Sequence, residues 1–478
     1  METMNNDIGV VGLAVMGENI IMNLEDKGFN VSVYNRTHEK VTRFVEGRAK
    51  NKNIHGFTSV EDFVKSLKKP RKILLMVKAG SAVDDTISTL KEFLENGDII
   101  IDGGNSNYKD TQRRFEELKE DSINYVGTGI SGGEEGALNG PSIMPGCSLD
   151  TWNEVSSILQ KISAKVDNEP CCEHIGPGGA GHFVKMVHNG IEYGDMQLIA
   201  ETYNILKDSG KTNDELSDIF SKWNEGKLNS YLIEITSQIF SKKENGSYVV
   251  DEILDSAGQK GTGKWTAIES LEQGIPLSMI TESVYARFIS SLVDERYKAS
   301  KIIQKNKQNV EIPSINYIEN ALFLSKLISY AQGFSLIKKA SDEYEWNINL
   351  SNVAKIWRAG CIIRSSFLND IMFAFNNELL DNLLLSDKFK DYVNDYQLSL
   401  RRIVSYSALS GIPLPGMSSA LSYLDSYISR RLPANLIQAQ RDFFGAHTYE
   451  KLNGEKGKKY HTNWTGKGGE TSSSSYNA

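Results

Sequence analysis

The stretch Ile8-Gly9-Val10-Val11-Gly12-Leu13-Ala14-Val15-Met16-Gly17 decides the fold of the first part of the chain. An apolar run ends in a turn that places Gly12, Ala14 and Gly17 at the spacing of a pyrophosphate-binding loop. Gly12 allows the tight turn, Ala14 lets the backbone approach a phosphate, and Gly17 permits close packing of the following helix on the strand. Glycine-rich turns are common, so the motif gains its weight from its place at the first strand of an alternating pattern.

The sequence around this stretch alternates apolar strand-like runs with helical periodicity up to about residue 177. Such alternation is typical of a parallel sheet with crossover helices. The expected strands are 8–13, 31–34, 73–77, 99–102 and 125–129, and the expected helices include 81–95 and 107–119. Beyond Gly181, long stretches of 3.6-residue periodicity continue to about Leu432. We therefore predict an α/β Rossmann-like dinucleotide-binding domain over residues 1–177, a large all-α domain over 178–432 and an extended C-terminal tail over 433–478.

The predicted tail is rich in glycine and contains a serine run at 472–475. A segment of this composition buries too little apolar surface to fold alone. One interpretation is disorder, and the other is an arm that becomes ordered on a partner subunit. We favour the arm, because Phe443, Phe444 and Tyr449 would be costly to leave in water.

The end of the second expected strand, Val31-Ser32-Val33-Tyr34-Asn35-Arg36-Thr37, distinguishes between the two nicotinamide cofactors. An acidic residue here would bind the ribose 2′-hydroxyl of NAD, whereas Arg36 and Thr37 suit the 2′-phosphate of NADP. The alternative is that Arg36 is a solvated loop charge. Its position after a strand of the alternating domain favours NADP as the cofactor.

The segment 178–193 carries a base, two polar groups and an acid at helical spacing. If its glycines begin a helix, one face presents Lys185, His188, Asn189 and Glu192. The residues that point into a core are Phe183, Val184, Met186, Val187 and Ile191. Lys185 and Glu192 could be solvated surface charges, but a helix this apolar is mostly buried, and buried charges need partners or a function. We therefore interpret the face as a catalytic site.

Composition excludes several classes of function. The 478 residues include 53 basic and 61 acidic residues, so the formal net charge of −8 argues against nucleic acid as a partner. Cys147, Cys171, Cys172 and Cys361 lack metal-ligand spacing, and no histidine motif indicates a metal. We find no signal peptide and no apolar run of the roughly 18 residues that would span a membrane. We expect a soluble cytoplasmic protein with reduced thiols and no metal.

Five further motifs resemble those of a known enzyme family. They are Val77-Lys78-Ala79-Gly80, Asp102-Gly103-Gly104-Asn105-Ser106, Gly129-Ile130-Ser131-Gly132-Gly133-Glu134-Glu135-Gly136-Ala137, Ser256-Ala257-Gly258-Gln259-Lys260-Gly261-Thr262-Gly263-Lys264-Trp265 and Gln440-Arg441-Asp442-Phe443-Phe444-Gly445-Ala446-His447-Thr448. With the features above, they resemble the β-hydroxyacid dehydrogenases and, among these, the decarboxylating 6-phosphogluconate dehydrogenases. The resemblance covers nearly the whole chain.

The resemblance implies oxidative decarboxylation of 6-phospho-D-gluconate to D-ribulose 5-phosphate and CO2, with reduction of NADP, in the oxidative pentose phosphate pathway. It also implies a homodimer in which each tail enters the partner's active site. The residues implied for the sugar acid's hydroxyls and carboxylate are Asn105, Ser131, Gly132, Gly133, His188, Asn189 and His447. Those implied for the 6-phosphate are Tyr193, Lys260, Arg287 and Arg441. The cofactor-binding set comprises Gly12, Leu13, Ala14, Val15, Met16, Gly17, Asn35, Arg36, Thr37, Val77, Lys78, Ala79 and Asn105.

The residue types on the predicted catalytic face suit this chemistry. Oxidation of an alcohol requires a base, and Lys185 serves only when neutral, so its pKa should fall from about 10.4 toward about 7 to 8 through desolvation and nearby positive charge. Protonated Lys185 can then donate to the ketone oxygen during loss of CO2. Glu192, if burial keeps it protonated, can protonate the resulting enediol. No metal is required, because the ketone is the electron sink.

Two alternatives remain at this point. A dehydrogenase for a shorter β-hydroxyacid, such as hydroxyisobutyrate, would share Lys185 but would not need the cations Lys260, Arg287 and Arg441. A noncatalytic NADP-binding protein on the same fold would have no reason to keep both Lys185 and Glu192.

Overall fold

The computed structural model of the chain describes residues 4–466. The chain divides into two compact units, Met1–Leu421 and Ser422–Ala478. Among the described helices, none combines the length and the apolar character that crossing a membrane would require.

The first unit begins with a sheet that has seven strands within the described residues, in the order β3-β2-β1-β4-β5-β6-β7. The strands are β1 (Ile8–Val11), β2 (Val31–Tyr34), β3 (Ile54–Phe57), β4 (Lys72–Leu75), β5 (Ile99–Asp102), β6 (Asn124–Ser131) and β7 (Ser142–Gly146). The first six run parallel, so that Val10 pairs with Val33 on one side and Leu74 on the other. This confirms the Rossmann-like prediction.

The predicted parallel sheet carries one antiparallel strand at its edge, because β7 runs antiparallel to β6. Neither β3 nor β7 was predicted. β3 reads IHGF, with one buried residue, and lacks an apolar run. β7 reads SIMPG, whose proline and glycine normally indicate a turn. Its proline is tolerated because β7 is an edge strand, where one row of backbone N–H groups needs no strand partner.

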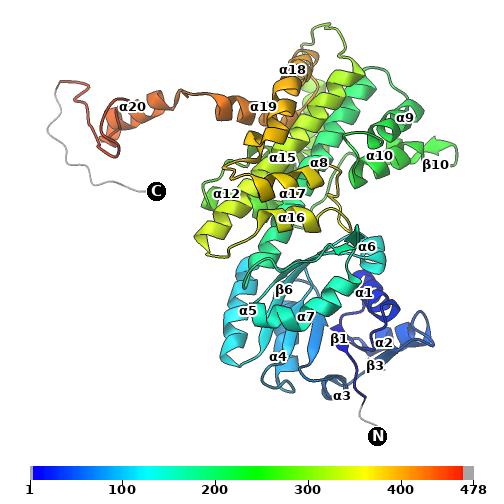
Figure 1. Cartoon of the computed structure of the whole chain (residues 1–478). Helices are drawn as coiled ribbons and strands as arrows, with labels where there is room; N and C mark the ends of the chain where they lie inside the picture. The colour runs from blue at the N-terminus through cyan, green and yellow to red at the C-terminus, as the bar shows by residue number, and fades with distance from the viewer. Residues whose placement is uncertain (1–3, 467–478) are drawn as a thin grey trace. The chain divides into compact units, whose positions relative to one another are not determined.

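Helices cover both faces of the sheet (Figure 1). They are α1 (Val15–Asp26), α2 (His38–Glu46), α3 (Val60–Lys65), α4 (Ser81–Lys91), α5 (Tyr108–Glu120), α6 (Gly133–Asn139) and α7 (Leu149–Ile162). Val10 and Leu74 belong to one apolar cluster, with residues of α1, α2, α6 and α7. Val11, Ile73 and Leu75 belong to another, with residues of α3, α4 and α5. Because successive side chains of a strand point to opposite faces, near-continuous apolar strands fill two cores at once.

The rest of the first unit is mostly helical, as predicted. The helices are α8 (Ala180–Asp208), α9 (Asn213–Asn224), α10 (Tyr231–Ser241), α11 (Val249–Glu252), α12 (Thr262–Glu272), α13 (Ser278–Ser291), α14 (Val293–Ile302), α15 (Ile315–Glu343), α16 (Leu350–Ile356), α17 (Leu368–Asn377) and α18 (Asp387–Ser410). The boundary between the two units falls within α19 (Pro415–Ile428). One short hairpin, β10 (Lys243–Glu244) with β11 (Ser247–Tyr248), interrupts these helices. Helix α8 packs against α15, and each has 29 residues.

The first turns of α8 lie directly on the sheet, where they contact β6 and β7 (Figure 1). Two glycines make this close approach possible. A Cβ atom at Gly181 would lie 2.3 Å from the Met144 carbonyl oxygen, and one at Gly129 would lie 2.3 Å from Lys185 Cβ. Neither position has room for a side chain. The sheet therefore holds the Lys185 backbone at the end of the Rossmann domain.

The second unit contains α20 (Ala434–Gly445) and a β-bridge between Tyr449 and Tyr460. The buried Asp442 carboxylate organises it, because it accepts hydrogen bonds from the backbone N–H groups of Thr448 and Thr462, at 2.9 and 3.0 Å. The Trp464 indole N–H donates to it as well, at 2.8 Å. The sequence did not indicate this local structure, since one carboxylate maintains it rather than an apolar pattern. The serine run at 472–475 lies outside the described residues.

Candidate active site

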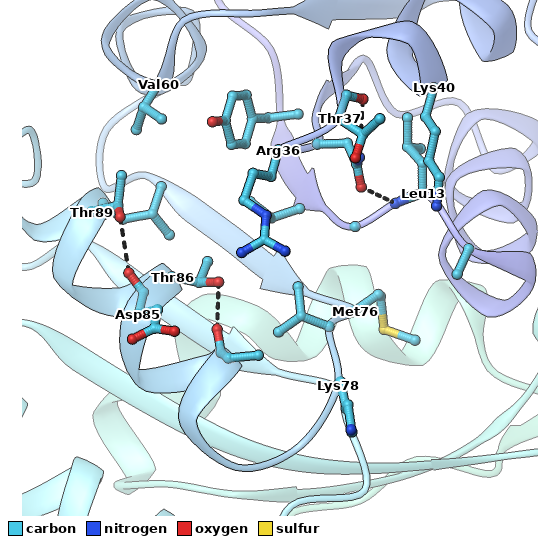
Figure 2. A pocket seen from close by; sticks show the side chains of 18 residues that line it. Leu13, Arg36, Thr37, Lys40, Val60, Met76, Lys78, Asp85, Thr86 and Thr89 are labelled. Carbon is cyan, nitrogen blue, oxygen red and sulfur yellow. Dashed lines mark hydrogen bonds between the residues drawn. The ribbon is translucent and has the colours of Figure 1, made fainter.

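A cavity of about 370 Å³ lies at the carboxyl ends of β1, β2 and β4 (Figure 2). The turn after β1 lines one part of it. Gly12 has φ +111°, and a Cβ atom there would lie 2.4 Å from the Met76 carbonyl oxygen, so the turn requires glycine. The Leu13 N–H donates to Asn35 Oδ1 at 3.0 Å, which ties this turn to the end of β2. The N-terminus of α1, which begins at Val15, follows directly and suits an anion.

Eight of the expected cofactor residues line this cavity: Gly12, Leu13, Ala14, Asn35, Arg36, Thr37, Val77 and Lys78. The other expected residues, Val15, Met16, Gly17, Ala79 and Asn105, are not among its lining residues. Gly17 has a packing role instead, since a Cβ atom there would lie 2.1 Å from the Gly12 carbonyl oxygen. Asn105 is exposed in the loop after β5.

Three basic side chains, those of Arg36, Lys40 and Lys78, line the cavity. Figure 2 shows the Arg36 side chain extending into the cavity, with Thr37 and Lys40 near the end of β2 and Lys78 below. Sequence reasoning missed Lys40, which lies four residues after Arg36 in the first turn of α2. It also missed Asp85, Thr86 and Thr89 on α4, because only the fold brings α4 to the cavity.

Lys185, His188 and Asn189 of the predicted catalytic face lie close together on α8. Lys185 is 6 % exposed, and its Nζ lies 3.5 Å from His188 Nδ1. His188 Nδ1 lies 3.0 Å from Asn189 Oδ1, which only accepts, so Nδ1 carries the proton and donates it. His188 Nε2 then accepts from the Ser131 hydroxyl at 3.2 Å. The apolar residues expected in the core, Phe183, Val184, Met186, Val187 and Ile191, are all buried.

Burial dominates the electrostatics of this face. It lowers the pKa of Lys185 from its ordinary 10.5 to about 8, against the opposing effect of Glu192. The expected contribution from nearby positive charge is not found, because the two neighbours that act on Lys185, Glu192 and Cys361, both raise its pKa. Burial also raises the pKa of Glu192, while Lys185 and Arg287 oppose the shift. The face thus holds a lysine that loses its proton at a lower pH than usual and a carboxyl that keeps its proton to a higher pH than usual.

The residues expected at the 6-phosphate fall into two groups. In the first unit, the Arg287 guanidinium lies 3.6 Å from the centre of the Tyr193 ring and donates to the Gly258 carbonyl oxygen at 2.9 Å. Lys260 is exposed in the same loop as Gly258 and acts electrostatically on Glu192, as Arg287 does. Arg441 belongs to the second unit, where it donates to Gln438 Oε1 at 3.1 Å.

The other residues expected to bind the substrate lie at the start of α6, on α8 or in the second unit. Gly132 and Gly133 begin α6 directly after Ser131, with φ +127° and +62°. Asn189 Nδ2 donates to Thr262 Oγ1 at 3.1 Å, which joins α8 to the start of α12. His447 is in the second unit, with its ring 5.9 Å from that of Phe444.

All four cysteines are buried and free. Burial raises the pKa of Cys147 and of Cys361 to about 12. These thiols therefore keep their protons at neutral pH.

The fold and this site define a class of protein: a dehydrogenase that binds a dinucleotide on a Rossmann domain and carries a buried lysine beside the sheet. Comparisons with known proteins narrow the class. Residues 7–176 match the model of the NAD binding domain of 6-phosphogluconate dehydrogenase, and residues 181–464 match that of its C-terminal domain.

Similar proteins agree over the full length. The decarboxylating 6-phosphogluconate dehydrogenase of Dictyostelium discoideum is 56 % identical over 491 residues, covering 100 % of both chains. The NADP(+)-dependent, decarboxylating enzyme of Bacillus subtilis is 56 % identical, covering 96 % of this chain and 98 % of that protein. The Plasmodium falciparum 6-phosphogluconate dehydrogenase, solved with NADP+ and with 6-phosphogluconate, superposes with a TM-score of 0.92 at 47 % identity, covering 96 % and 100 % of the two chains. The chain belongs to the family of decarboxylating 6-phosphogluconate dehydrogenases.

Proposed function

We propose that the chain oxidises and decarboxylates 6-phosphogluconate to ribulose 5-phosphate and CO2 with NADP, and that Lys185 and Glu192 carry the proton transfers. The observation that supports this most is the pairing on one helix face of a buried lysine, whose pKa is about 8, with a carboxyl whose pKa is raised. An enzyme that needs a base and then an acid requires such opposed environments. Membership of this family argues against a noncatalytic NADP-binding protein and against a dehydrogenase for a shorter β-hydroxyacid.

NADP fits the cavity at β1, β2 and β4, where the glycine turn, the α1 N-terminus and Arg36 with Lys40 suit a dinucleotide with a 2′-phosphate. When bound, it accepts the hydride from C3 of the substrate. The chain's own part in this step is to remove the hydroxyl proton from the same carbon. Neutral Lys185 is the proposed base, because its burial leaves a large neutral fraction near pH 8.

The second step uses the proton that Lys185 has gained. The 3-keto acid has its carbonyl β to the carboxylate, so the electrons released with CO2 pass to that oxygen. Protonated Lys185 donates to the oxygen as negative charge develops on it. The enediol that remains needs a proton at the carbon that lost CO2, and Glu192 supplies it, since burial raises its pKa. The hydroxyl that Lys185 protonated returns its proton to neutral Lys185, which restores the ketone of the product.

The substrate is held by groups of fixed orientation in this proposal. His188 is oriented by Asn189 and Ser131, so its ring can present a defined face to the hydroxyls. Gly132 and Gly133 offer backbone N–H groups at the start of α6. Arg287 on the Tyr193 ring, together with Lys260, receives the 6-phosphate. Asn105, which is exposed in the loop between β5 and α5, is a further contact for the substrate in this proposal.

We further propose a homodimer in which the second unit of each chain completes the partner's site through Arg441 and His447. Apolar side chains on α20 support this, because Leu436, Phe443 and Phe444 are 60, 57 and 73 % exposed in the single chain. Helices α12, α13 and α14 also carry exposed apolar residues, among them Leu271 and Ile302. Surfaces of this kind are typical of subunit contacts. We also propose that the protein works in the cytoplasm, in three parts with boundaries near residues 177 and 432.

One assay tests the proposed reaction. Purified protein with 6-phosphogluconate and NADP should raise the absorbance at 340 nm and release CO2 in equal molar amount. Hydroxyisobutyrate in place of the sugar acid should give no signal. NADPH formation without CO2 would reject the decarboxylation, and no NADPH would reject the function.

A further inference from the structure

Arg114 on α5 contacts three separate segments of the Rossmann domain, although only 1 % of its side chain is exposed. Its Nε and one terminal nitrogen each donate to the Asp84 carboxylate at 2.8 Å. The same terminal nitrogen donates to the Gly80 carbonyl oxygen at 3.1 Å. The other terminal nitrogen lies 3.7 Å from Asp102 Oδ2 and has no hydrogen-bond partner among the described residues.

The first two contacts fix one wall of the cofactor cavity. Gly80 ends the loop between β4 and α4, in which Val77 and Lys78 line the cavity, and it is the residue before the first turn of α4. Asp84 lies in that first turn. The next two residues, Asp85 and Thr86, line the cavity, and Figure 2 shows them below it with Lys78. Arg114 thus holds the loop and the helix that follow β4 without lining the cavity itself.

The third contact lies under the loop that carries Asn105. Asp102, the last residue of β5, is fully buried. Its Oδ1 accepts from the Gly104 N–H at 3.0 Å, and its Oδ2 accepts from the Ser106 hydroxyl at 2.6 Å. These bonds shape the chain on both sides of Asn105. The Arg114 guanidinium therefore contacts one loop at the Gly80 carbonyl oxygen and lies beside the Asp102 carboxylate, which shapes the other loop.

Only an arginine can make these contacts together. A planar guanidinium presents several donors in fixed directions, whereas a lysine ammonium is a point charge on a flexible stem. The hydrogen bond from Arg114 is also the largest cause that holds the pKa of Asp84 down, at about 2, so the pair stays ionised across the working pH range. A charge buried this deeply is tolerated only when its partners are in place.

We propose that Arg114 is a positioning residue of the cofactor site, which holds the β4–α4 loop and the Asn105 loop in one fixed arrangement. The proposal rests on the function proposed above, because it concerns the alignment of NADP with the substrate. Arg114 touches neither. It acts through Gly80, Asp84 and Asp102.

The test is Arg114→Lys in the full-length protein. We expect the Kd of NADP, measured by calorimetry, to rise roughly tenfold, and kcat to fall about 10- to 100-fold, the range for misplacement of reacting groups by about 1 Å. The isotope effect with substrate deuterated at C3 should increase, because hydride transfer becomes the slow step. A merely structural role would lower the unfolding temperature and leave the Kd and the isotope effect unchanged, and that result would overturn the proposal.

Arg113→Lys is the matched control. Arg113 also pairs with Asp84, at 2.8 Å, but its side chain is 45 % exposed and contacts neither Gly80 nor Asp102 in the described structure. Its Kd for NADP should stay at the wild-type value, and an equal effect in both variants would overturn the proposal. If Arg114→Lys does not fold, Asp84→Asn decides, since it weakens the same bonds from a partly exposed position. A weaker NADP complex supports the proposal, and an unchanged Kd rejects it. If the wild-type protein shows no turnover, the proposed function fails, while the NADP binding data still judge Arg114.

Discussion

The face of α8 that carries Lys185 and the end of β2 that carries Arg36 are built in opposite ways. Lys185 is buried against the sheet, and burial lowers its pKa to about 8. Arg36, Thr37 and Lys40 are exposed around an open cavity. A group that must gain and lose a proton near neutral pH needs a desolvated place, whereas a group that binds a permanent anion needs only a fixed position and access to it.

Removal of the buried base is expected to have the largest effect. Lys185→Ala should lower kcat by roughly 10²- to 10⁴-fold, because the variant has no other base on this face. NADP should still bind, since Lys185 does not line the cofactor cavity. Steady-state kinetics measures kcat, and calorimetry measures the binding of NADP. Lys207→Ala, at the far end of the same helix, is the control. Turnover within a few-fold of wild type would rule out Lys185 as the base.

Loss of the buried acid should separate the two chemical steps. Glu192→Gln keeps the shape of the side chain but has no proton to donate, so we expect the overall turnover to fall by roughly 10²-fold. NADPH formation in a single turnover, followed by stopped-flow absorbance, should survive much better, because the acid acts after hydride transfer. An equal loss in both measurements would assign Glu192 to substrate positioning.

The exposed cations should have a smaller effect that concerns the choice of cofactor alone. Arg36→Asp removes a partner of the 2′-phosphate and introduces an acceptor for a ribose hydroxyl. We expect the preference for NADP over NAD, as a ratio of kcat/KM values, to fall roughly ten- to hundredfold. Arg43→Ala changes an exposed residue of α2, the helix after Arg36, that does not line the cavity, and it should leave the ratio unchanged. A constant ratio in Arg36→Asp would show that other residues discriminate.

The pH dependence of the two regions should differ as well. Lys185 acts when neutral, and its lowered pKa makes it neutral above about pH 8. We therefore expect kcat/KM to rise about tenfold per pH unit up to about pH 8. Burial raises the pKa of Glu192, and loss of its proton should lower the overall turnover. The Kd of NADP, measured over the rising limb, should change less. A flat kcat/KM between pH 6 and pH 8 would contradict the role of Lys185.

The smallest expected signal tests whether a partner completes the site. Arg441→Ala and Lys185→Ala homodimers should each be nearly inactive. Refolded in equal amounts, half the dimers are mixed, and each mixed dimer has one intact site if tails are exchanged. Activity should then recover to roughly a quarter of wild type. With mixed dimers verified by mass spectrometry, a failure to recover would show that each tail serves its own chain.

Local patterns predicted much of this molecule. The run from Ile8 to Gly17 identified the first strand, the turn and the helix, because both the glycine requirement and the apolar run are local. The helix at α8 was also readable, since its polar and apolar residues follow a 3.6-residue period. The antiparallel edge strand β7 was not, because its proline and glycine indicate a turn and only pairing with β6 makes it a strand.

The site shows the same division. Which residues could serve as base, acid and phosphate ligand follows from their types and spacing, so the sequence by itself predicted these roles for Lys185, Glu192 and Arg36. Lys40, Thr86 and Arg114 gain their places only when α2, α4 and α5 are packed on the sheet. The pKa of Lys185 was also decided by tertiary structure. Desolvation depends on every group packed around a side chain. Here α8 packs against β6 and β7, which are distant from Lys185 in the sequence, and no local pattern predicts that contact.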